Sequence, residues 1–145
     1  MKIDRTVETS APSSEVFDFL ADFTTTEQWD PGTVRTERVS GDGGVGTTYA
    51  NTSRFLGRTT DLTYVVETYE PGTRFALRGE NKTVVAHDTM TFAPTATGGT
   101  SVRYVAEFKM KGIARIVAPL LKPAFTRLGD TASAQLRTTL ARLDR

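Results

Sequence analysis

The chain contains no cysteine and only one histidine, His87. Without cysteine there can be no disulfide framework, no thiolate zinc site and no cysteine nucleophile. A single histidine cannot supply a metal site of recognisable spacing. Alternation along its strand puts His87 on the outer face, where a solvated side chain is the simplest interpretation. We therefore expect neither a metal nor a cofactor.

A charge excess of one sign is also lacking, since 18 basic residues face 17 acidic ones and the two signs are interspersed. A nucleic-acid-binding protein usually carries a basic excess or stripe. Long hydrophobic runs are missing too, because the stretch from Ile113 to Leu121 is too short to span a bilayer and contains Arg115. The N-terminal residues lack the apolar core of a signal peptide. These features predict a cytoplasmic protein that binds no nucleic acid and has no stable membrane insertion.

What the sequence does contain is a regular succession of short apolar patterns. Residues 2–9 alternate like a strand, with Ile3 and Val7 on one face. Pro12 suits the first turn of a helix, and a second short helix is expected to carry Trp29. Six strand-like segments follow, at about 33–40, 46–55, 58–69, 73–80, 83–93 and 100–110. Their short connections predict an antiparallel meander, because a parallel crossover needs a dozen or more residues.

From Ile113 onward the apolar period becomes that of a helix, whose apolar face is expected to lie in the core. Pro119 and Pro123 each remove a backbone donor, which predicts a kink or break near its start. The part from Pro123 to Leu143 would be about 30 Å long, which matches a strand of about ten residues. We therefore predict an α+β fold in which residues 1–145 form one domain. A curved antiparallel sheet of about seven strands wraps around the long C-terminal helix, and two short helices follow the first strand.

This order of elements resembles the helix-grip superfamily, which is also called SRPBCC. The sequence marks that carry the resemblance are Ala11-Pro12 before Glu15-Val16-Phe17, Trp29 ahead of Pro31-Gly32, Gly46-Thr47, Tyr69-Glu70-Pro71, and Phe92 followed by Gly98-Gly99-Thr100. The superfamily includes START lipid-transfer domains, birch-pollen-allergen proteins and bacterial polyketide cyclase/dehydrase-like proteins, and the pattern is closest to the last group. The resemblance implies a cavity between sheet and helix that binds a hydrophobic or amphipathic small molecule. No catalytic motif of one subfamily is present.

Strand alternation predicts which side chains point into this interior. The inward faces are mostly apolar with a few polar groups, as ligand sites usually are. The expected ligand-binding residues on the strands are Tyr49, Asn51, Ser53, Tyr64, Phe75, Asp88, Met90, Tyr104 and Phe108. The others are Trp29 near the expected mouth and Val117, Leu121 and Phe125 on the terminal helix. Each has a packing alternative: the tyrosines can fill the core, the amide and hydroxyl can bond within the sheet, and the tryptophan can plug one end.

Asp88 is the most informative of these residues, because an unpaired buried carboxylate is costly and its pKa rises. Three arrangements are open: a bulge turns Asp88 to solvent, Asp88 pairs with an arginine, or it serves a ligand. We favour the bulge, which would also exchange the faces of His87 and Asp88. Arg5 has inward parity as well, and a snorkelling side chain at the strand edge is favoured there over an anion anchor.

Three classes of function follow from this interior, and no oligomeric state is predicted. A carrier that sequesters a lipid, polyketide or isoprenoid needs no catalytic group and ranks first. A polyketide cyclase or dehydratase would use the same cavity, with Asp88, Tyr64 or Tyr104 moving protons. An interaction module would show an exposed apolar patch and a cavity filled by side chains, and the mixed-charge strand faces give it little support.

Overall fold

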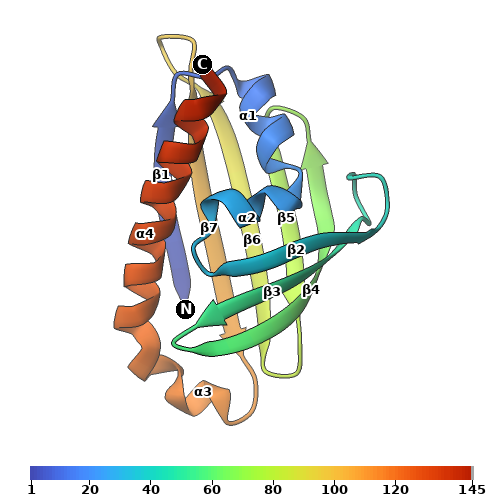
Figure 1. The fold of residues 1–145 in the computed structure, drawn as a ribbon, viewed down its shortest axis with the longest axis vertical. Coiled ribbons are helices and arrows are strands. Elements are labelled where there is room, and N and C mark those ends of the chain that lie inside the picture. Colours follow the sequence, from blue (N-terminus) through green and yellow to red (C-terminus); the bar gives the residue numbers. More distant parts are fainter. Residues whose placement is uncertain (145) are drawn as a thin grey trace.

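The computed structural model describes residues 1–144 and shows a curved antiparallel sheet with one long helix packed along it (Figure 1). The strands are β1 (Lys2–Thr9), β2 (Thr33–Ser40), β3 (Thr48–Phe55), β4 (Arg58–Glu70), β5 (Arg74–Glu80), β6 (Val84–Pro94) and β7 (Thr100–Met110). The helices are α1 (Ser13–Leu20), α2 (Thr26–Trp29), α3 (Ala114–Val117) and α4 (Lys122–Ala141), with 3-10 turns η1 (Phe23–Thr25), η2 (Ala118–Leu121) and η3 (Arg142–Asp144). The predicted helix-grip architecture is confirmed.

The sheet has the strand order β1-β7-β6-β5-β4-β3-β2, and every neighbouring pair is antiparallel. The six strands from β2 to β7 form the expected meander, whereas β1 pairs with β7 from the far end of the chain. Register shifts occur between β2 and β3 and between β4 and β5, at Val66/Thr68. Such irregularities bend a sheet and increase its twist. Figure 1 shows β2 and β3 crossing the other strands steeply, so the sheet forms a concave face.

One half of the concave face is filled by side chains. Val16, Phe17 and Leu20 recur at helical spacing on α1, and all three are buried. The Phe17 ring meets Phe75 and Phe92 edge-on, with ring centroids 6.4 and 5.2 Å apart. Aromatic pairs prefer this geometry because the positive ring edge meets the negative face. The α1 end of the interior is therefore a packed core.

The C-terminal region contains the break that its prolines predict. The helical path runs through α3, η2 and α4 in succession, and Pro119 and Pro123 lie at the two changes. Helix α4 then packs against β1. Gly129 allows the close approach, because a Cβ there would lie 2.9 Å from Ile3 Cγ2. Arg5 of β1 forms an ion pair with Asp130 of α4 at 3.0 Å, so this arginine links the edge strand to the helix.

The expectation that the whole apolar face of the terminal helix lies in the core is wrong for its first turns. Ile113, Ile116 and Leu120 are 82%, 76% and 79% exposed. The break at the prolines turns this part away from the sheet, whereas Leu136 and Leu140 farther along are fully buried. Among residues 1–144, no helix combines the length and apolar character needed to cross a membrane.

Candidate functional site

A cavity of about 210 Å³ lies between the concave face and α4, at the α3 end of the molecule. Its wall comes from β3, β4, β6, β7, the β5–β6 turn, α4, η1 and the loop after α2. The lining residues are Phe23, Asp30, Gly32, Asn51, Ser53, Arg54, Phe55, Thr60, Leu62, Tyr64, Thr83, Val84, Asp88, Tyr104, Phe108, Met110, Phe125 and Leu128. Helix α1 does not reach this end, which leaves the space open.

Aromatic rings form most of the wall. Phe125 of α4 contacts Phe108 of β7 and Phe55 of β3, with ring centroids 5.2 and 4.7 Å apart. The Tyr64 ring packs against the Phe23 ring, with centroids 4.9 Å apart. Gly79, opposite Tyr64 on β5, makes room for this ring, because a Cβ there would lie 2.7 Å from Tyr64 Cε1. The sheet and α4 thus present aromatic surfaces to one another across the cavity.

Asp88 points into this cavity, and the expected bulge is wrong. The ladder runs without interruption through Asp88, which pairs with Leu77 on one side and Ala106 on the other. The residue is 5% exposed, and His87 faces outward. The Tyr104 hydroxyl donates a hydrogen bond to Asp88 Oδ2 at 3.1 Å. Within the described chain, Asp88 Oδ1 is buried without a hydrogen-bond partner, and no arginine pairs with the carboxyl.

Burial dominates the electrostatics of this group and raises the pKa of the Asp88 carboxyl to about 7. The hydrogen bond from Tyr104 opposes the rise, and the negative charge of Asp30 adds to it. Asp30 also lines the cavity, and burial raises its pKa, against hydrogen bonds from the Gly32 backbone N–H and the Thr33 hydroxyl. Burial together with the charge of Asp88 raises the pKa of Tyr104 well above its ordinary range, so its hydroxyl stays a donor.

Asn51 and Ser53 line the cavity but already have partners inside the protein. Asn51 Nδ2 donates to Thr36 Oγ1 at 2.9 Å, and the Ser53 hydroxyl donates to Asn51 Oδ1 at 2.6 Å. Thr36 in turn bonds the hydroxyl of Thr26 at 2.6 Å. This network links β2, β3 and α2. It supports the structural alternative for the two residues, because their hydrogen-bonding groups are occupied without a ligand.

Other residues expected at the site lie elsewhere. Tyr49, Phe75 and Met90 are fully buried in the packed core and do not line the cavity. Alternation correctly puts them on the inner face, but that face extends over both the filled and the open half of the interior. Val117 is 44% exposed, and Leu121 is half-buried against the Phe125 cluster. Neither borders the cavity, because the helix breaks before α4.

Trp29 is a core residue with a link to the site. It is 1% exposed, does not line the cavity, and meets the Tyr104 ring edge-on at 5.4 Å. Its Nε1 is buried without a hydrogen-bond partner among the described residues. These positions favour the plugging alternative over a gate. Trp29 fixes the ring whose hydroxyl holds Asp88.

Several lining residues were not among the expected ones. Alternation places Phe55, Leu62 and Met110 on the inner face, although they were not among the expected ligand-binding residues. Asp30 follows α2 in a turn, where no periodicity predicts direction. Leu128 lies one helical turn beyond Phe125, so helical spacing places the two side chains on the same face of α4. In the part of the chain that the structure describes, no cluster of three or more histidine or acidic residues could hold a metal ion.

The strand order, the long helix and the cavity between them define the helix-grip, or START-like, class. Residues 1–141 match the family described as polyketide cyclase / dehydrase and lipid transport. The chain belongs to this family. Among curated proteins, none matches it by sequence.

Solved structures share the fold over nearly the whole chain. Zhui aromatase/cyclase from Streptomyces sp. R1128 superimposes with a TM-score of 0.84 at 16% identity, covering 100% of this chain and 96% of that one. The protein TTHA0849 from Thermus thermophilus superimposes with a TM-score of 0.82 at 13% identity, covering 100% of both chains. A START superfamily protein from Mycobacterium smegmatis superimposes with a TM-score of 0.80 at 12% identity, covering 98% of each chain. Likeness at these identities establishes a common fold.

Proposed function

We propose that the chain is a single ligand-binding domain that carries a small, hydroxylated apolar molecule in the cavity between the sheet and α4. The observation that carries the proposal is the Asp88 carboxyl, which lines the mainly apolar cavity and whose Oδ1 is buried without a hydrogen-bond partner among the described residues. Buried polar groups are nearly always hydrogen-bonded, and exceptions call for an explanation. A ligand group that bonds this oxygen provides one. A cytoplasmic location stays a prediction from the sequence.

A hydroxyl group suits Asp88 better than other polar groups. With a pKa of about 7, the Asp88 carboxyl is present in both forms near neutral pH. A hydroxyl donates to the carboxylate and accepts from the protonated carboxyl, whereas a carbonyl can only accept. The hydrogen bond from Tyr104 to Oδ2 leaves Oδ1 for the ligand. An alcohol or phenol therefore fits the site in either protonation state.

The dimensions of the cavity restrict the apolar part of the ligand. A volume of 210 Å³ corresponds to about seven water molecules in the liquid. This is enough for a small ring system, and a longer chain would need the mouth to widen. Burial of apolar area supplies the affinity, at about 2.5 kcal/mol for each 100 Å² before ordering costs. The rings of Phe55, Phe108 and Phe125 favour an aromatic or alicyclic ligand.

An enzyme that uses the same cavity is the second candidate. Two carboxyl groups with raised pKa, Asp30 and Asp88, and the Tyr104 hydroxyl border one apolar space. Of these groups the Asp88 carboxyl has a pKa of about 7, and a group that titrates near neutral pH is typical of proton-transfer residues. Asp88 would then take or give the proton during cyclisation or dehydration of a bound polyketide-like chain. The structural likeness to the Streptomyces aromatase/cyclase supports this candidate.

Native mass spectrometry of the freshly purified protein, followed by extraction and identification of any released compound, tests the carrier. A thermal-shift comparison of a naphthol with its methyl ether then tests the role of the hydroxyl. We expect the naphthol to stabilise the protein more, and Asp88→Leu to remove the difference, because one hydrogen bond is worth about 1 kcal/mol. His87→Leu is the matched control, since it lies next in the same strand but faces outward.

The outcomes separate the two candidates. A stoichiometric apolar adduct that is released unchanged supports the carrier. Turnover of the bound compound that disappears in Asp88→Asn but survives Trp29→Phe would establish the enzyme instead. A protein that purifies without adduct and is not stabilised by any member of a lipid and polyketide panel would contradict both.

A further inference from the structure

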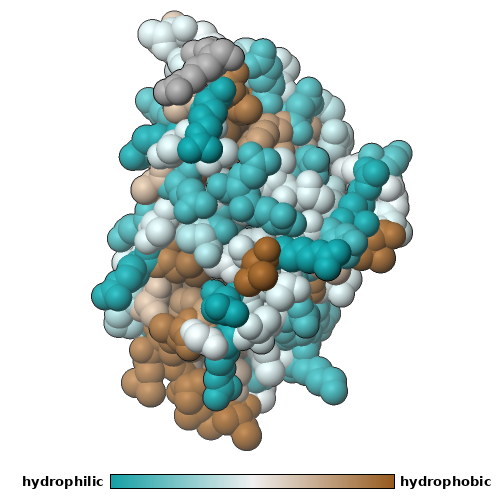
Figure 2. Space-filling view, in the orientation of Figure 1, coloured by the Kyte–Doolittle hydropathy of each residue, from teal (hydrophilic) through white to brown (hydrophobic). Residues whose placement is uncertain are grey.

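The segment from Ile113 to Leu121, called here the α3–η2 segment, concentrates exposed apolar side chains. Ile113, Ile116, Val117 and Leu120 are 82%, 76%, 44% and 79% exposed. Figure 2 shows the resulting apolar surface at the end of the molecule where α3 projects beyond the strands. Single exposed apolar residues are ordinary, whereas a contiguous group marks an interaction surface. This segment therefore has the composition of an interaction surface.

The charge around the α3–η2 segment is strongly one-sided. Residues 108–129 contain five basic and no acidic residues, while the remaining sequence contains 13 basic and 17 acidic residues. The five are Lys109, Lys111, Arg115, Lys122 and Arg127. Only Lys111 forms an ion pair among residues 1–144, with Glu80. The near-neutral total thus hides a basic region whose cations are mostly without acidic partners.

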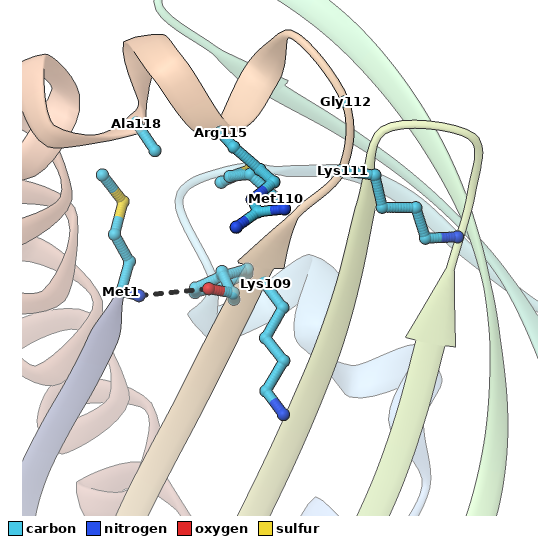
Figure 3. Close-up of a pocket in the computed structure, with 8 residues that line it drawn as sticks. Met1, Lys109, Met110, Lys111, Gly112, Arg115 and Ala118 are labelled. Carbon is cyan, nitrogen blue, oxygen red and sulfur yellow. Dashed lines mark hydrogen bonds between the residues drawn. The ribbon is translucent and has the colours of Figure 1, made fainter.

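An open hollow of about 670 Å³ lies between α3 and the ends of β1 and β7. Figure 3 shows Arg115 extending from α3 toward the end of β7. Lys109 extends along β7, and Lys111, just after the end of that strand, extends to the side away from Arg115. Phe108 and Met110 line this hollow and also the ligand cavity. The basic, apolar surface is therefore continuous with the cavity wall.

We propose that the α3–η2 segment docks onto an anionic lipid surface, with its apolar side chains among the acyl chains and the basic residues at the head groups. Interfacial segments combine this composition, apolar on one side and rich in Lys and Arg around it. A symmetric dimer fits less well, because it would bring the basic region of one copy against the same region of the other. The proposal rests on this surface alone and does not depend on which ligand the cavity holds.

Co-sedimentation with large vesicles tests the proposal, using phosphatidylcholine alone and an equal mixture with phosphatidylserine. We expect binding to the mixed vesicles that weakens as salt rises. Arg115→Gln with Lys122→Gln should weaken it about 25-fold, at about five-fold per basic residue. Ile116→Asp with Leu120→Asp should weaken it about 100-fold, since each buried aliphatic side chain contributes about ten-fold. All four side chains are exposed, so the fold is preserved.

Val34→Asp with Val39→Asp is the matched control, because these residues are 55% and 64% exposed on β2. Retained binding in this variant supports the α3–η2 segment as the contact. Absence of wild-type binding to both vesicles overturns the proposal, and so does an equal loss in the control. Sedimentation velocity tests whether a second copy of the chain binds this surface instead. A wild-type dimer that becomes monomeric in Ile116→Asp with Leu120→Asp would assign the surface to self-association and would also overturn the proposal.

Discussion

The two ends of the interior are built from the same strands and yet differ completely. At the α1 end, Phe17, Phe75 and Met90 are fully buried and fill the space between sheet and helices. At the α3 end, Asp88, Phe108 and Phe125 border an open cavity. The strands alternate in the same way at both ends, so the difference comes from the helices that cover them. The α1 end provides stability, and the α3 end gives up stability for space.

The largest expected contrast is between phenylalanines at the two ends. Phe17→Ala should lower the free energy of unfolding by about 3–5 kcal/mol, because it leaves a hole in a close-packed region. Phe125→Ala should cost only about 1–2 kcal/mol, since its ring already borders empty space and loses fewer contacts. Urea unfolding monitored by circular dichroism measures both values. Equal costs would mean that the cavity end is as tightly packed as the other.

Asp88→Asn should produce a smaller effect that depends on pH. The unfolded carboxyl ionises above about pH 4, whereas the folded one has a pKa of about 7. Between these values the unfolded state binds fewer protons, so wild-type stability falls as pH rises through this window. Asparagine has no such titration. The stability of the variant relative to wild type should therefore increase by about 2–4 kcal/mol from pH 4 to pH 8.

Thermal and urea unfolding of both proteins across this range give the comparison. A difference that stays constant with pH would show that Asp88 ionises equally in the folded and unfolded states, and the buried-carboxyl description would then be incorrect.

Gly79→Ala should have a smaller effect than Phe17→Ala, and it tests the boundary between the packed end and the cavity end. The added methyl group would lie 2.7 Å from the Tyr64 ring, which must shift toward the cavity. Such overpacking costs about 1–3 kcal/mol. Tyr64→Leu in the same background should recover part of the loss, because it removes the ring that clashes. A double-mutant cycle from urea unfolding measures this coupling, and purely additive effects would rule out the contact.

Most of the fold could be predicted because its signals are local. Short turns after each strand leave only an antiparallel meander, and Pro119 with Pro123 marks the break between α3 and α4. The burial of Ile113 and Ile116 was predicted wrongly for a physical reason. Helical periodicity shows that apolar side chains share a face, but it does not show whether that face meets the sheet once the helix axis has turned.

The site was less predictable than the fold. Parity placed Asp88 and Tyr104 on the inner face, and it placed Met90 there equally, although only the first two border the cavity. Which inward residues meet empty space depends on how far α1 and α2 reach, and that is a tertiary property. Asp30 reaches the cavity from a turn, where sequence spacing gives no direction.

The pairing of β1 with β7 has a consequence for how the chain reaches this structure. Lys2 lies opposite Glu107 and Thr9 opposite Thr100. Among residues 1–144, β7 is the one strand that pairs with β1, and it is the last strand of the sheet in chain order. A ribosome must therefore reach the start of β7 before β1 can begin to pair, and it must complete most of β7 before the pairing is finished. Contacts between such distant residues carry a large loop-closure cost and slow folding to about milliseconds or seconds. Until then β1 is an unpaired edge, and its capture by β7 also creates the surface on which α4 packs.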